Sequence, residues 1–184
     1  MQKNQAHLAV RRICLCALLC AMSVLLGYIA KMIFGTSPLR LTFENLPVVF
    51  AGIAYGPVYG ALVGAVADLS NCLFAGQAPV ALITVGAAAV GLFSGLLARF
   101  VLRRRTLLSL LAIELITQLS ASVIIKSVAL HIYFSYPYIV LLPRLPIYIG
   151  IALAEGYCLY VLFKHPAIGR YISSKEGHDE HDDL

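Results

Sequence analysis

The stretch VALITVGAAAVGLFSGLLARFV, from Val80 to Val101, decides the fold of this chain. It contains one charged residue, Arg99, which lies near its end. A helix needs roughly 20 predominantly apolar residues to cross the hydrocarbon core of a bilayer. This stretch is long enough and apolar enough, so the sequence predicts a transmembrane helix here.

Further apolar runs occur on both sides of this helix. They are Ile13–Phe34, Phe43–Tyr55, Val58–Phe74, Leu107–Leu130 and Tyr138–Phe163. The two runs that precede Val80 are short and flank Gly56–Pro57, a dipeptide typical of turns. We expect two spans joined by a tight turn there, the first of them short or distorted. The alternative is one long kinked helix, which would leave five spans.

The composition agrees with a membrane protein. Of the 184 residues, 60% are hydrophobic and 12% are charged, whereas a soluble domain carries about 25% charged residues. The chain lacks the alternating segments of about ten residues that form transmembrane β-barrels. We therefore predict an all-α integral membrane bundle of six transmembrane helices. Residues 1–165 would form this six-helix transmembrane domain, and residues 166–184 a disordered polar tail.

Lys and Arg residues predict the orientation, because cytoplasmic loops of membrane proteins are enriched in them. Ten of the 14 fall on one side of the predicted bundle: Lys3, Arg11, Arg12, Arg99, Arg103, Arg104, Arg105, Lys164, Arg170 and Lys175. Only Lys31 and Arg40 fall on the other side. Both termini are therefore expected in the cytoplasm. The net charge of +5 reflects this topology, and no nucleic-acid partner is expected.

Motifs for metal binding and catalysis are missing from the sequence. The five cysteines show no CxxC or Cys–His ligand spacing, and the His- and Asp-rich end of the chain is expected to be solvated tail. Walker A, HExxH and GxSxG motifs are absent. The sequence thus predicts no metal site, no cofactor and no enzymatic activity.

Several polar residues fall inside the predicted spans, where ionisable groups are costly and usually functional. Glu114, Gln118, Ser122 and Lys126 form a stripe at four-residue spacing in the fifth run, and Glu155 lies in the inner half of the sixth. Several others converge on the outer half. The candidate substrate-binding residues are Arg144, Asp68, Asn71, Lys126, Glu44, Ser122 and Tyr148.

The chemistry of these candidates suits an anionic heterocycle. The guanidinium fork of Arg144 matches a carboxylate, and Lys126 supplies a point charge. Asp68 can accept two hydrogen bonds from a ring with adjacent N–H donors, such as an aminopteridine. The alternative is that Asp68 pairs with Lys126 or Arg144 for structural reasons only.

Small residues recur at four-residue spacing, which places them on one helix face and permits close helix packing. The glycines Gly52, Gly56, Gly60 and Gly64, and the pair Gly91 and Gly95, are best explained by packing inside the bundle. Ala17 and Ala21 in the first run either pack internally or face a partner protein.

Four stretches carry a family resemblance. They are Leu41-Thr-Phe-Glu-Asn-Leu-Pro47, Ala51-Gly-Ile-Ala-Tyr-Gly-Pro57, Gly60-Ala-Leu-Val-Gly-Ala-Val-Ala-Asp68 and Pro143-Arg-Leu-Pro146. With them, residues 10–165 resemble the substrate-binding (S) components of energy-coupling factor (ECF) vitamin transporters, specifically the folate-type group.

The resemblance implies a multi-pass protein of the bacterial cytoplasmic membrane with a vitamin pocket near its outer face. It implies assembly with a transmembrane coupling protein and two ABC ATPases, and delivery of substrate by toppling of the S component in the bilayer. Ala17 and Ala21 match the family's contact with the coupling protein. Asp68 and Arg144 match polar positions of the folate-type pattern.

Two departures keep alternatives open. The stretch Gly76-Gln-Ala-Pro-Val-Ala-Leu-Ile-Thr84 lacks the aromatic residues of the folate-type pattern, and Ile147 replaces a frequent Lys. Another vitamin or a related heterocycle is therefore an alternative ligand. A different class of function is a self-contained secondary transporter, with Asp68, Glu114 and Glu155 as proton carriers.

Overall fold

The computed structural model describes residues 2–34, 43–76, 78, 80–101, 106–125, 128, 131–132 and 144–164, with side chains placed for these except 2–9, 34, 101, 122, 123 and 144. This part of the chain is helical and contains no strand. The helices are α1 (Gln2–Phe34), α2 (Asn45–Tyr55), α3 (Pro57–Phe74), α4 (Ala81–Val101), α5 (Leu107–Thr117), the π-helix η1 (Gln118–Ile125) and α8 (Arg144–Lys164). The predicted tail lies outside the described residues.

Four segments are long and apolar enough to cross a membrane: Val10–Ile33, Pro57–Phe74, Ala81–Phe100 and Leu145–Lys164. Two further apolar helical segments, Asn45–Tyr55 and Leu107–Ala121, are shorter. With α5 and η1 counted as one continuous helix, the six predicted helices are all present. The prediction that the second would be short is confirmed, because α2 has 11 residues and extends only about 17 Å.

A tight turn at Gly56 separates α2 from α3. Gly56 has a φ of 100°, which favours glycine, and its N–H donates to the carbonyl of Gly52 at 3.0 Å. Pro57 then opens α3, where its missing N–H costs no helical hydrogen bond. The chain reverses at this point, so the alternative of one long kinked helix is wrong.

Glycines bring α2, α3 and α4 into close contact. A Cβ atom added to Gly60 would lie 2.5 Å from the carbonyl oxygen of Gly91 and 2.6 Å from Cα of Gly52. A Cβ atom on Gly64 would lie 2.3 Å from the carbonyl oxygen of Ala87. The predicted role in internal packing is confirmed for Gly52, Gly60, Gly64, Gly91 and Gly95, whereas Gly56 serves the turn.

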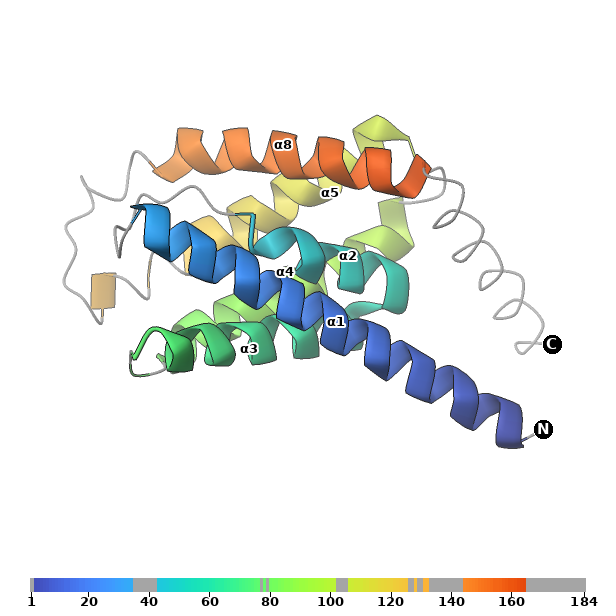
Figure 1. The fold of residues 1–184 in the computed structure, drawn as a ribbon. Helices are drawn as coiled ribbons and strands as arrows, with labels where there is room; N and C mark the ends of the chain where they lie inside the picture. Colours follow the sequence, from blue (N-terminus) through green and yellow to red (C-terminus); the bar gives the residue numbers. More distant parts are fainter. Residues whose placement is uncertain are drawn as a thin grey trace.

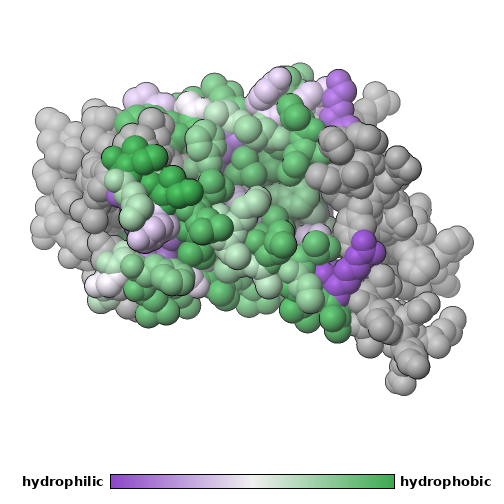
Figure 2. Space-filling model, in the orientation of Figure 1, coloured by the Kyte–Doolittle hydropathy of each residue, from purple (hydrophilic) through white to green (hydrophobic). Residues whose placement is uncertain are grey.

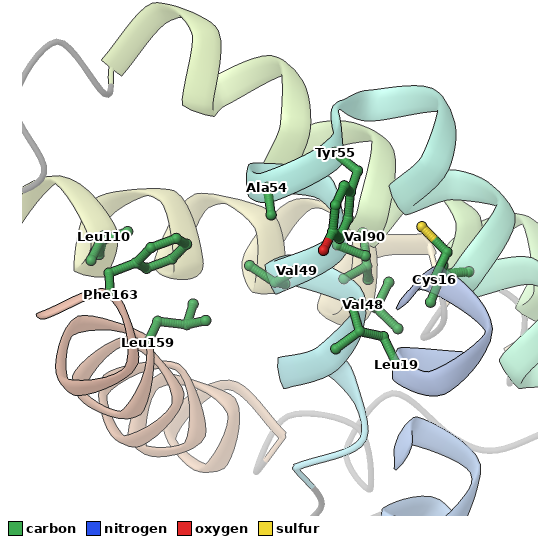
Figure 3. Close-up of a cluster of buried hydrophobic side chains, with 13 residues drawn as sticks. Cys16, Leu19, Val48, Val49, Ala54, Tyr55, Val90, Leu110, Leu159 and Phe163 are labelled. Carbon is green, nitrogen blue, oxygen red and sulfur yellow. The ribbon is translucent and has the colours of Figure 1, made fainter. Parts of the chain in front are cut away.

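The remaining helices pack around this three-helix unit. Helix α1 lies against α3 and α2, while α8 pairs with α5 and η1, which also contact α4 (Figure 1). Buried side chains of α1, α2, α4, α5 and α8 meet in one apolar cluster, which includes Leu19, Val49, Val90, Leu110 and Leu159 (Figure 3). The rings of Phe50 and Phe163 stack beside it at 5.3 Å between centroids.

The outer surface of the helices is apolar. Large hydrophobic side chains such as Leu18, Leu73 and Val58 are more than half exposed. Figure 2 shows one face of the molecule as mostly hydrophobic, with smaller hydrophilic patches toward both ends and along the upper edge. Lipid tails cover such a surface without the cost that water would impose. The protein is therefore a multi-pass membrane protein.

The two ends of the bundle differ. The start of α1 and the end of α8 lie at the same end, on the right in Figure 1. The end of α1 and the end of α3 lie at the opposite end. The first described helix therefore begins, and the last one ends, at the same end of the bundle, as the predicted orientation requires.

Candidate functional site

A cavity of about 100 Å³ opens among α1, α2, α3 and α4 at the end of the bundle away from the start of α1. Its apolar wall includes Val48, Ile83 and Ala87. Its polar lining consists of Ser23, Lys31, Glu44, Asn45, Asp68 and Asn71. The cavity thus combines a cation, two acidic side chains and amide groups over a small apolar base.

Helix α1 contributes one face to this cavity. Ser23, Gly27 and Lys31 follow one another at four-residue spacing and therefore share that face. The hydroxyl of Ser23 donates to the backbone carbonyl of Glu44 at 2.6 Å. The Nζ atom of Lys31 donates to the backbone carbonyl of Asn71 at 2.9 Å. These two bonds fix α1 to the start of α2 and to the end of α3.

Gly27 provides the room that two of the site residues need. A Cβ atom added to Gly27 would lie 2.7 Å from Nδ2 of Asn71 and 2.8 Å from Oε2 of Glu44. The two side chains therefore meet over the bare backbone of α1, although they belong to different parts of the chain. A larger residue at position 27 would displace both.

Asp68 is anchored from α4. The hydroxyl of Thr84 donates to Oδ2 of Asp68 at 2.8 Å, which uses one of the carboxylate's acceptor positions. The second carboxylate oxygen has further lone pairs that can accept from a ligand. Asp68 is thus held in place while keeping acceptor capacity at the cavity.

Asn71 presents an unsatisfied acceptor. The residue is 8% exposed, and its Oδ1 atom is buried with no hydrogen-bond partner among the described residues. A buried polar atom without a partner costs free energy, on the order of 1–3 kcal/mol. A ligand N–H group at this position would remove that cost.

The structure brings together three of the predicted site residues: Glu44, Asp68 and Asn71. Tyr148 is buried in α8 and is not part of the lining of this cavity. Lys126 lies outside the described residues. The backbones of Ser122 and Arg144 are described in η1 and α8, but the predictions for their side chains fall outside the described part.

Four residues of this site are absent from the sequence-based candidates: Ser23, Lys31, Asn45 and Thr84. Of these, Lys31 enters the sequence-based prediction only as a basic residue of the outer side. A usable signal existed for α1, because Ser23, Gly27 and Lys31 align on one face of an otherwise apolar helix. No sequence pattern indicates Thr84, because its role depends on how α4 packs on α3.

Ala17 and Ala21 lie on a different face of α1 from the one that Ser23 and Gly27 turn toward the cavity. Both are exposed, whereas Cys16, Leu19 and Ser23 of the same helix are buried. The alternative in which Ala17 and Ala21 pack inside the bundle is therefore wrong for this structure. Their face is open to lipid or to a partner.

No metal site is formed by the described residues, where no group of three or more His, Cys, Asp or Glu side chains comes together. The site instead offers hydrogen-bond acceptors and an ammonium group inside a membrane bundle. Such an arrangement can bind a small polar solute without reacting with it. It defines a solute-binding membrane subunit.

Comparison with known proteins identifies the family. Residues 11–164 match the family described as "ECF transporter, substrate-specific component", and the chain belongs to this family. No curated protein sequence matches the chain. Among solved structures, it is similar to "Crystal structure of FolT bound with folic acid", with a TM-score of 0.67 and 19% identity over 82% of this chain and 90% of that one. This likeness shows a shared fold.

Proposed function

We propose that this chain is a folate-type S component that binds folate or a closely related anionic heterocycle in the outer cavity. The fold is shared with a protein whose structure was solved with folic acid, which supports the ligand class. The observation that carries the proposal is the lining of the cavity. It combines the acceptors of Asp68 and Asn71 with the ammonium group of Lys31.

Each group has a counterpart in a folate-like molecule. An aminopteridine ring offers adjacent N–H donors, which suit the carboxylate of Asp68 and the unsatisfied Oδ1 of Asn71. The carboxylates of the glutamate part suit cations. Lys31 is the described candidate for that contact, and Lys126 and Arg144 remain predicted ones.

The described cavity would hold one end of such a ligand. Pockets for drug-sized molecules span roughly 300–1,000 Å³. The cavity among α1 to α4 has a volume of about 100 Å³, which is smaller than this range. The ring system is the part that this narrow, partly apolar cleft suits best.

Transport would require partner proteins. As an S component, the chain is proposed to sit in the bacterial cytoplasmic membrane and to assemble with a transmembrane coupling protein and two ABC ATPases. The exposed Ala17 and Ala21 on α1 support the contact with the coupling protein, because small residues allow a second helix to approach closely. Substrate release inward would follow reorientation of the whole subunit.

The proposal is tested on the purified chain without partners. Folate should bind tightly by calorimetric titration, and mass spectrometry of the purified protein should detect a folate that co-purifies. Biotin and thiamine serve as control vitamins, because neither has an aminopteridine ring. Tight binding of a control with no response to folate would remove the folate assignment while leaving the family membership intact.

A further inference from the structure

Four polar side chains lie buried where α2, α5, η1 and α8 meet. Glu114, Gln118 and Glu155 are fully buried, and Asn45 is nearly so. The amide of Gln118 joins them, since its Nε2 donates to Oε2 of Glu155 at 2.5 Å while its Oε1 accepts from Nδ2 of Asn45 at 3.1 Å. The carboxyl group of Glu114 faces both Glu155 and Gln118.

This cluster has more acceptors than donors. Both carboxyl oxygens of Glu114 and the Oε1 atom of Glu155 are buried and have no hydrogen-bond partner among the described residues. The hydroxyl oxygen of Thr117 is likewise buried and has no hydrogen-bond partner among the described residues. An ionised carboxylate can only accept hydrogen bonds, so two ionised carboxylates leave these oxygens without a donor.

The described residues also supply no compensating charge around the pair. Among the described residues, no Lys, Arg or His side chain acts on Glu114 or Glu155, and the other charged group that faces Glu155 is Glu44, of the same sign. Burying an uncompensated carboxylate is very costly, and two that face each other cost more. A positive ion bound by the pair would lower this cost.

We propose that Glu114 and Glu155 together form a proton-binding site inside the bundle, and that Gln118 and Asn45 connect this site to the outer cavity. A proton on the pair turns one acceptor oxygen into an O–H donor, which supplies the missing hydrogen bond and reduces the buried charge. The proton belongs to the pair and not to either residue, because two interacting carboxyl groups titrate together.

The connection to the cavity is short. Asn45 lines the cavity and also donates to Gln118, and Glu44 stands beside it at the same end of α2. Gln118 begins η1, and π-helical turns occur frequently at functional sites. If a ligand shifts Asn45, the bond between Gln118 and Glu155 shifts with it. Proton binding at the pair and ligand binding in the cavity are then linked, and each changes the other by the same factor.

Infrared spectroscopy of the purified chain tests the proton site. At neutral pH the protein should show the C=O stretching band of a buried, protonated carboxyl group. The band should vanish in the double variant Glu114→Gln, Glu155→Gln, which keeps side-chain size. Each single Gln variant should also remove or shift the band. The single variants therefore provide the test if the double variant does not fold. Glu176→Gln, which changes a carboxyl group beyond α8, should leave the band unaltered.

Two outcomes overturn the proton site. One is an absent band, or a band that the Gln variants leave unchanged. The other is a specific stabilisation by sodium. If the site binds a proton, the wild type should unfold at the same temperature in NaCl and in choline chloride at equal ionic strength. A sodium-specific increase that the variants lose would place Na⁺, and not a proton, between the carboxyl groups.

The link to the cavity rests on the proposed function and is tested separately with folate as the probe. The folate affinity of the wild type should differ between neutral and alkaline pH by more than that of the double Gln variant. Equal pH dependence in both proteins overturns the link. If folate does not bind at all, the proposed ligand fails, while the infrared result still decides on the proton site.

Discussion

At the scale of single residues, a substitution at Asp68 can weaken ligand binding without destabilising the fold. Asp68→Asn keeps an oxygen that can accept from Thr84, so the contact between α3 and α4 is retained. It removes the charge that a ligand's N–H donors would meet. A hydrogen bond to a charged group contributes about 1.5–3 kcal/mol. We expect folate affinity to fall roughly 10- to 150-fold with little change in the unfolding temperature.

The control for this change is Thr84→Val, which leaves the carboxylate of Asp68 in the cavity and removes its anchor. Its affinity should fall less than that of Asp68→Asn. If Asp68→Asn bound folate as the wild type does, Asp68 would have only the structural role with Thr84.

Gly27 tests the geometry of the same cavity. In Gly27→Ala the new methyl group would come within 3 Å of polar atoms of Asn71 and Glu44, so both side chains must move. We expect at least about a tenfold loss of folate affinity, which is about 1.4 kcal/mol, measured by titration. Gly150→Ala is the matched control, because nothing lies within 4 Å of the added Cβ there. Equal affinity in both variants would place the ligand away from Asn71 and Glu44.

The sequence revealed part of this site for physical reasons. Charged and amide groups in an apolar chain stand out, so Glu44, Asp68 and Asn71 could be predicted to lie close together, as they do around the cavity. Thr84 and the gap at Gly27 could not, because they matter only through the way α1 and α4 pack against α3. Gln118 and Glu155 were recognised as polar residues of two different helices, but their bond depends on three-dimensional contact.

At the scale of helices, the contact of α2, α3 and α4 is the most sensitive to added volume. In Gly60→Ala the methyl group would lie about 2.5 Å from backbone atoms of two neighbouring helices, which cannot move aside as a side chain can. Overpacking costs typically about 1–3 kcal/mol. We expect a clearly lower unfolding temperature in detergent.

Leu62→Ala on the same helix is the control for Gly60→Ala. Leu62 is 57% exposed and faces outward, so its removal changes a surface that lipid or detergent covers. The unfolding temperature should stay close to that of the wild type. Equal losses in the two variants would contradict the tight contact between these helices.

Helix α1 has two faces with different expected roles. Ala17→Leu with Ala21→Leu adds bulk to the exposed face and leaves the buried face with Ser23 and Gly27 untouched. We expect the variant to bind folate normally but to lose co-purification with the coupling protein and the ATPases. Val66→Leu, on the exposed face of α3, should assemble as the wild type does. Normal assembly of the alanine variant would place the partner on another face.

At the scale of the whole molecule, hydrophobic runs and charge placement were sufficient to predict the bundle. Each apolar run in a membrane protein must form a helix, since unpaired backbone groups are too costly in lipid. The turn at Gly56–Pro57 could also be predicted, because a Gly-Pro dipeptide is a local turn signal. The change from α5 to η1 at Gln118 could not be predicted, because a π-helical turn depends on packing and polar contacts that the sequence alone does not show.

The described part of the chain has a cavity at one end and an apolar exterior, and the chain belongs to the family of ECF transporter substrate-specific components. Under the proposed function, the chain captures its solute without an energy source, and accumulation against a gradient depends on ATP hydrolysis by the proposed partners. Proteoliposomes with this chain alone should therefore bind radiolabelled folate without accumulating it, even under a proton gradient. Addition of the coupling protein, the two ATPases and ATP should produce accumulation, and an ATPase variant without its Walker A lysine should abolish it. Accumulation by the chain alone under a proton gradient would instead establish a secondary transporter, with the proton bound at Glu114 and Glu155 as its driving ion.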